Sequence, residues 1–180
     1  MAIKVKTIWP YAGIPLLGTA LLLSRAEPAF SMLWKELIII FGYIAAVYDL
    51  KTKRIPNALV LAMLGLWFVT IITKLFFDSG QAFVLMKDSG LGFLIGGGLF
   101  LLVYYVSRRG LGGGDVKFMA AAGLYLGLPG ILSAMLLGTL FAALSGLFLI
   151  IIKKIGRKDS IPLVPFLYLG ALVVCFAAQC

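Results

Sequence analysis

The chain has 180 residues, of which 62% are hydrophobic and only 13% are charged, and its mean hydropathy is +1.09. A soluble domain is usually about half apolar and a quarter charged, so this composition excludes an ordinary soluble protein. The net charge of +9 does not indicate a nucleic-acid partner, because most basic residues flank apolar runs, as they do in membrane proteins.

Seven apolar segments follow one another along the chain, and most are long enough to cross a hydrocarbon layer about 30 Å thick. Each is expected to be a helix, because an open strand would leave backbone groups unsatisfied in lipid. We therefore predict an all-α, polytopic helical membrane bundle of about six or seven transmembrane helices, forming one integral membrane domain over residues 1–180. The segments are residues 8–24, 32–50, 58–77, 91–107, 115–128, 131–152 and 161–178.

The first segment follows Lys4 and Lys6, a pattern that also occurs in secretory signal peptides. No small-residue cleavage site follows cleanly, so we expect a retained helix. The fifth segment, 115–128, reaches only about 20 Å at helical rise, which could make it re-entrant.

The basic residues predict on which side of the membrane each loop lies. If all seven segments cross from an inner N-terminus, the basic clusters at 4–6, 51–54, 108–117 and 153–158 share the inner side. That side then carries the whole net charge of +9, as the positive-inside rule expects. The segment 115–128 is therefore expected to cross, or to form a tilted hairpin with the segment after it.

Glycines recur at helix-packing spacings. Gly92 and Gly96 are four residues apart, as are Gly123 and Gly127, and such pairs let helix backbones approach closely. Packing within one chain is favoured over a dedicated dimer face, and a homo-oligomer remains the alternative. The separate glycine run at 112–114 carries no side chains, so an extended peptide could lie beside its backbone.

Two aspartates lie within or beside the predicted helices, where ionisable residues are costly and are functional candidates. Asp49 lies near the end of the segment 32–50. Trp34 marks the outer interface of that helix, and helical rise places Asp49 about 22 Å away, near the inner boundary. Asp115 begins the fifth segment, and the predicted topology places it at the same boundary.

Two carboxylates at one depth on different helices suggest a catalytic dyad that shares one proton. The ionised carboxylate can take a proton from water, while the neutral one polarises a peptide carbonyl and later protonates the leaving amine. The chain has no His, and its only cysteines, Cys175 and Cys180, lie in or after the last segment. A His-assisted triad is therefore excluded, and neither a metal nor a cofactor is expected.

Structural roles compete with this chemistry. Asp115 precedes a helix and could cap it, and Asp49 could pair with Lys51, Lys53 or Arg54.

Two other functions also use such aspartates: a cation-coupled transporter, which would place them nearer mid-membrane, and a noncatalytic assembly subunit. The remaining carboxylates, expected to be ordinary solvated charges, are Glu27, Glu36, Asp78, Asp88 and Asp159.

Three motifs resemble those of the type IV prepilin peptidases, the GxGD-type aspartic proteases of bacterial membranes. Residues 49–57 read Asp-Leu-Lys-Thr-Lys-Arg-Ile-Pro-Asn, and residues 112–117 read Gly-Gly-Gly-Asp-Val-Lys. Residues 161–166, Ile-Pro-Leu-Val-Pro-Phe, resemble the proline-bearing C-terminal helix of the family. The resemblance covers roughly residues 37–180 and implies that Asp49 and Asp115 are the catalytic pair.

The resemblance also implies a substrate and a location. The substrate is a prepilin with a short basic leader and an apolar helix, cut at the cytoplasmic face of the bacterial inner membrane. The long form of the family carries paired CxxC motifs that this sequence lacks, so the chain is similar to the short form of Flp-type pilus assembly, and archaeal preflagellin peptidases are a related alternative. N-methylation of the cleaved pilin is not expected. The residues expected to support catalysis or substrate binding are Gly112, Gly113, Gly114, Lys117, Thr52, Pro56 and Asn57.

Overall fold

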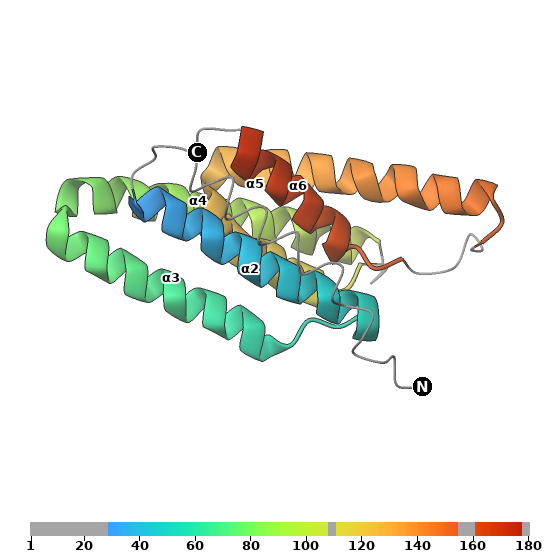
Figure 1. Cartoon of the computed structure of the whole chain (residues 1–180), viewed down its shortest axis with the longest axis horizontal. Coiled ribbons are helices and arrows are strands. Elements are labelled where there is room, and N and C mark those ends of the chain that lie inside the picture. Colours follow the sequence, from blue (N-terminus) through green and yellow to red (C-terminus); the bar gives the residue numbers. More distant parts are fainter. Residues whose placement is uncertain (1–28, 108–110, 155–160, 178–180) are drawn as a thin grey trace.

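The computed structural model describes residues 29–107, 111–154 and 161–177, and these residues form helices joined by short turns and loops. The described part contains no strand, so the predicted all-α class is confirmed there. Figure 1 shows the helices running along a common long axis. They are α2 (Ala29–Thr52), α3 (Asn57–Phe77), α4 (Ser79–Val106), α5 (Gly113–Ile151) and α6 (Val164–Ala177).

Four of the described helices, α2 to α5, are long and apolar enough to cross a membrane. The helix α6 is apolar but shorter, at 14 residues. The segment predicted at 8–24 lies outside the described residues. The described part therefore supports a helical membrane protein with four membrane-length helices, which is a coarser result than the predicted six or seven crossings.

The helices α2 and α3 match the predicted segments 32–50 and 58–77, and a short loop separates them. Lys53, directly after α2, takes a positive φ of 50°, which ends the helix. Pro56 is the N-cap of α3 with an extended backbone, and its ring fixes φ at −66°. Proline also disfavours helical geometry at Ile55, the residue before it, which keeps α2 and α3 apart. The sequence Lys-Arg-Ile-Pro thus turns the chain back within four residues of α2.

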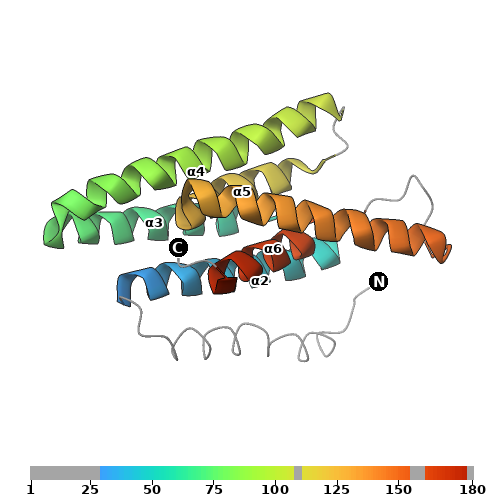
Figure 2. The ribbon, with the colours of Figure 1, turned by 90° about the horizontal axis from the view of Figure 1, so that it is seen from above.

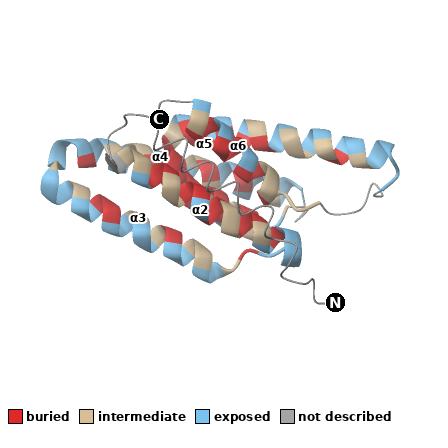
Figure 3. Cartoon of the chain, viewed as in Figure 1, coloured by how far each residue is buried: buried red, intermediate tan, exposed pale blue. Residues whose placement is uncertain are grey.

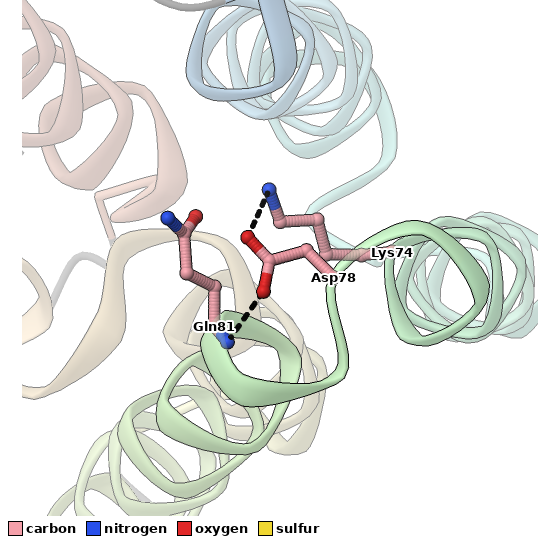
Figure 4. Close-up of polar contacts among 3 residues, drawn as sticks. All are labelled: Lys74, Asp78 and Gln81. Atoms are coloured by element: carbon pink, nitrogen blue, oxygen red, sulfur yellow. Dashed lines mark hydrogen bonds and ion pairs between the residues drawn. The ribbon is translucent and has the colours of Figure 1, made fainter.

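The helix α4 corrects the predicted segment 91–107, because it already begins at Ser79. Asp78 is its N-cap, and its Oδ1 accepts a hydrogen bond from the Gln81 backbone N–H at 3.1 Å. Its other carboxylate oxygen lies 4.0 Å from Lys74 Nζ, as Figure 4 shows. Charged residues near this end were expected to lie in a loop, but a capped helix can carry them at a membrane–water interface.

The helix α5 reverses direction at Gly127 and forms a hairpin. Gly127 has φ 65° and ψ −176°, a conformation that is open essentially only to glycine. We call residues 113–126 the first arm and residues 128–151 the second arm. A Cβ on Gly96 of α4 would lie 2.8 Å from the Met119 carbonyl of the first arm and 2.9 Å from Ile131 of the second. One residue of α4 thus touches both arms, and Figures 1 and 2 show the arms folding back on each other.

The hairpin matches the alternative expected for the segments 115–128 and 131–152. Its bend lies at Gly127, two residues before the Pro129–Gly130 pair at which the sequence suggested it. Pro129 instead lies in the first turn of the second arm, where a missing N–H costs no helical hydrogen bond. Both ends of the hairpin therefore lie at the end of the bundle where α2 ends (Figure 1).

Asp88 of α4 anchors the bend. It was expected to be a solvated charge, but its Oδ1 accepts a hydrogen bond from the Leu128 backbone N–H at 3.0 Å. Leu128 starts the second arm, so its N–H has no partner within that helix. The carboxylate therefore acts as a cap supplied by a neighbouring helix.

Glycine contacts bring α4 against the first arm of α5. A Cβ on Gly92 or on Gly123 would overlap the backbone of the other residue. Three of the four glycines in the two predicted pairs, Gly92, Gly96 and Gly123, therefore form helix contacts within one chain. The fourth, Gly127, forms the bend of α5. On the far side of α5, a Cβ on Gly170 of α6 would meet the backbone of the second arm at Gly138, 2.7 Å from its nitrogen. Figure 3 shows buried residues concentrated where these helices meet and exposed ones along α3 and the end of the second arm.

The Gly92–Gly123 contact predicts a strong effect of a single methyl group. Gly123→Ala should lower the unfolding free energy in detergent by about 1–3 kcal/mol, because the added carbon must push two backbones apart. Gly90→Ala, on the neighbouring helix α4, is the control, since no atom lies within 4 Å of its Cβ position. Equal thermal stability of the two variants would contradict the close backbone contact.

Candidate active site

A cavity of about 620 Å³ opens at the end of the bundle where α2 ends and where α3, α5 and α6 begin. Both candidate aspartates line it, together with segments far apart in the sequence. The complete lining is Asp49, Lys53, Arg54, Ile55, Asn57, Leu111, Gly112, Gly113, Gly114, Asp115, Lys117, Ile161, Pro162 and Leu163.

Asp49 reaches the cavity from the last turn of α2 and is only 5% exposed. Its Oδ2 accepts a hydrogen bond from the Val164 backbone N–H at 3.0 Å. Val164 is the first residue of α6, and the positive end of a helix dipole favours a carboxylate there. Lys53 lies close enough for its charge to act on Asp49 as well.

Asp115 comes from the first turn of α5 and is 8% exposed. The N-cap of α5 is Gly112, and the Asp115 carboxylate, three residues further on, lies beside the Gly112 backbone, where it can also stabilise the start of the helix. Its carboxylate and that of Asp49 are near enough for their charges to interact. Two like carboxylates in a shared, largely buried cavity favour a state with one proton between them.

The three glycines before Asp115 have three different environments. A Cβ on Gly112 would lie 3.0 Å from Asp115 Oδ2. A Cβ on Gly114 would lie 3.2 Å from the Cβ of Ile55, in the loop that joins α2 to α3. No atom lies within 4 Å of the Cβ position of Gly113. Gly112 therefore leaves room for the carboxylate, and Gly114 lets the loop pass close to α5.

The remaining predicted residues divide into two groups. Lys117 Nζ donates a hydrogen bond to Asn57 Oδ1 at 3.0 Å, so these two residues join α5 to the start of α3 at the cavity wall. Thr52 and Pro56 are not in the cavity wall. The Thr52 hydroxyl lies within hydrogen-bonding distance of the carbonyls of Tyr48 and Arg54, and Pro56 caps α3, so both shape the loop and do not face the cavity.

Several residues of the cavity wall were not predicted as site residues. Lys53 and Arg54 place two cations in the wall, and residues 161–163 form a non-helical stretch leading into α6. The Ile-Pro sequence at 161–162 was noted as a motif without a role. Its position is explained by Asp49, which binds the backbone directly after it.

Acid–base chemistry on a water molecule is what this arrangement can perform. Within residues 29–107, 111–154 and 161–177, no group of three or more His, Cys, Asp or Glu residues gathers to hold a metal ion. The cavity offers two carboxylates, a run of glycines and a non-helical backbone segment at 161–163. One carboxylate can act as a base and the other as an acid toward a bound peptide.

Known proteins with similar sequences have been compared with the chain. A model of the type IV leader peptidase family matches residues 37–151, which include both aspartates. The chain is 30% identical over 133 residues to a prepilin leader peptidase/N-methyltransferase of Xanthomonas campestris pv. campestris, covering 71% of this chain and 44% of that protein. Proteins of the same name match from Pectobacterium carotovorum subsp. carotovorum, at 31% over 71% of this chain and 44% of theirs, and from Escherichia coli, at 30% over 71% and 56%.

These matches confirm the resemblance inferred from the three motifs. The chain spans about half the length of the curated relatives it matches. No solved structure matches the chain significantly. Because the family model covers well over half of its residues, the chain belongs to the type IV leader peptidase family.

Proposed function

We propose that this protein is a membrane-embedded aspartic endopeptidase that removes the basic leader from prepilins. The observation that carries the proposal is the meeting of Asp49 and Asp115, from two different helices, in one cavity at the end of an apolar bundle. Relatives that match about 70% of the chain are named prepilin leader peptidases, which supports a prepilin as the substrate.

The proposed reaction needs only the dyad and one water. The ionised carboxylate takes a proton from the water, whose oxygen attacks the scissile carbonyl carbon. The protonated carboxylate donates a hydrogen bond to the carbonyl oxygen as negative charge develops there. Collapse of the tetrahedral intermediate breaks the C–N bond, and a carboxyl proton passes to the leaving amine. The Val164 N–H group, held on Asp49 Oδ2, favours Asp49 as the ionised partner.

We place the site at the cytoplasmic face of the bacterial inner membrane. The basic residues at 51–54 and 153–154 lie at the same end of the bundle as the cavity, and such clusters favour the inner side. A leader in the cytoplasm and an apolar segment in the bilayer would both be within reach of a cavity at this boundary.

The proposed substrate is of the Flp-like class, and only the peptidase activity is proposed. The sequence has no CxxC motif, which the long, bifunctional form carries, so N-methylation is not assigned to this chain. A noncatalytic assembly subunit with the same fold is the competing interpretation, and replacement of the dyad separates the two.

Asp49→Asn and Asp115→Asn should each reduce leader cleavage by about 10³-fold or more, because either change removes one half of the acid–base pair. The measurement is processing of a prepilin by each purified variant in vesicles. Asp78→Asn is the control, since this carboxylate caps α4 at the opposite end of the bundle. If both dyad variants still process the prepilin, the proposed mechanism is wrong.

The glycine run provides a sharper test of geometry. Gly112→Ala should lower kcat by about tenfold, because its methyl group would displace the Asp115 carboxylate from a 3.0 Å contact. Gly98→Ala, on α4 outside the cavity and with no atom within 4 Å of its Cβ position, should retain cleavage within about twofold. Similar kcat values for the two variants would contradict the position of Asp115 in the cavity.

A further inference from the structure

A second concave surface lies between α3 and α4, over the first arm of α5. It is an apolar hollow of about 560 Å³, which we call the α3–α4 groove. It is lined by Leu61, Leu64, Gly65, Trp67, Phe68, Phe93 and Leu124.

Gly65 makes this surface hollow. No atom lies within 4 Å of its Cβ position, so the α3 backbone itself forms part of the groove. The helix α3 is also weakly held, since only Met63, Thr70 and Ile71 are buried among its 21 residues. Small residues in an apolar helix face allow another helix to approach closely.

The groove leads away from the dyad cavity. Asn57 begins α3 and lines the cavity, and Leu61, one helical turn further, lines the groove. Along α5, Lys117 lines the cavity and Leu124, two turns further, forms the floor of the groove. A chain segment that leaves the cavity past the exposed hydrogen bond between Lys117 and Asn57 therefore reaches an apolar surface over residues 61–68 of α3 and the first arm of α5.

We propose that the α3–α4 groove holds the apolar helix of the prepilin while its scissile bond lies at the dyad. This inference rests on the proposed peptidase function and assigns a binding surface to it. The occupant must be apolar, helical and continuous with a peptide in the cavity, and a helix seated in an apolar groove is a common recognition mode.

A second apolar hollow of about 710 Å³, between the second arm of α5 and α6, is less suited to this role. The hydrogen bond from Val164 to Asp49 ties α6 to α2 on that side of the cavity. The face of α6 behind it is packed, with eight buried residues in 14. The hydrogen bond that bridges the α3 side, from Lys117 to Asn57, joins two exposed side chains, whereas the bond from Val164 to Asp49 is buried. Because α3 is also weakly held and has an open glycine, it offers the easier path for a substrate.

The test compares Gly65→Leu with Gly98→Leu. Both glycines are exposed on helices and have no atom within 4 Å of the Cβ position, so both variants should fold. Only the first fills the groove. Two substrates are used in vesicles: a full prepilin with its apolar helix, and a short peptide that carries the leader and a few residues after the cut. Gly65→Leu should lower kcat/KM for the prepilin by about tenfold more than for the peptide, and Gly98→Leu should change neither.

Cross-linking provides a second readout that does not need cleavage of the short peptide. A photoreactive residue at Phe93 should cross-link to the prepilin helix in the Asp115→Asn protein. One at Leu102, exposed on the same helix outside the groove, should not.

The proposal is overturned if Gly65→Leu cleaves the prepilin as the wild type does, if it loses both substrates equally, or if Phe93 and Leu102 cross-link alike. It is also overturned if Ser145→Leu, which fills the α5–α6 hollow, gives the selective loss instead. A wild-type protein that cleaves neither substrate would count against the peptidase function itself, which keeps the two failures distinct.

Discussion

Two like carboxylates, Asp49 and Asp115, must be held in one largely buried cavity at the end of an apolar bundle, and the arrangement of helices serves this requirement. The backbone N–H at the start of α6 binds one of them, and the first turn of α5 presents the other. Gly127 sends α5 back along itself, so that the same helix both presents Asp115 and packs against α6 near Asp49. The negative charge of these carboxylates would be costly in lipid. The positive ends of the α5 and α6 helix dipoles, which meet at the cavity, stabilise it.

Much of this could be predicted from the sequence, because the signals were strong and local. Long apolar runs in a membrane have to be helices, so the class and the positions of α2 and α3 followed directly. The two aspartates stood out because ionisable residues are rare in such runs, and the glycine spacing indicated a close helix contact that forms between Gly92 and Gly123. The role of the dyad in catalysis remains a prediction.

Other features depended on contacts between distant residues, which a sequence pattern does not contain. Asp88 looked like a loop charge until its partner, the Leu128 N–H, was known 40 residues away. The early start of α4 was missed for a different reason, because the charges at Lys87 and Asp88 suggested a loop, whereas Asp78 caps a helix that carries them. The role of residues 161–163 beside Asp49 required α6 to pack on α2, a contact made across 115 residues. The α3–α4 groove forms because Gly65 has no side chain to fill it, and a single glycine in an apolar helix leaves no periodic pattern in the sequence.

The central claim is that the two carboxylates occupy one site, and cysteine cross-linking in native membranes tests it most directly. In a background with Cys175→Ala and Cys180→Ala, the pair Asp49→Cys and Asp115→Cys should be joined rapidly by a reagent that spans only neighbouring side chains. The control pair Asp49→Cys and Asp88→Cys, at opposite ends of the bundle, should remain unjoined. Cross-linking of the control pair, or none between positions 49 and 115, would contradict the account.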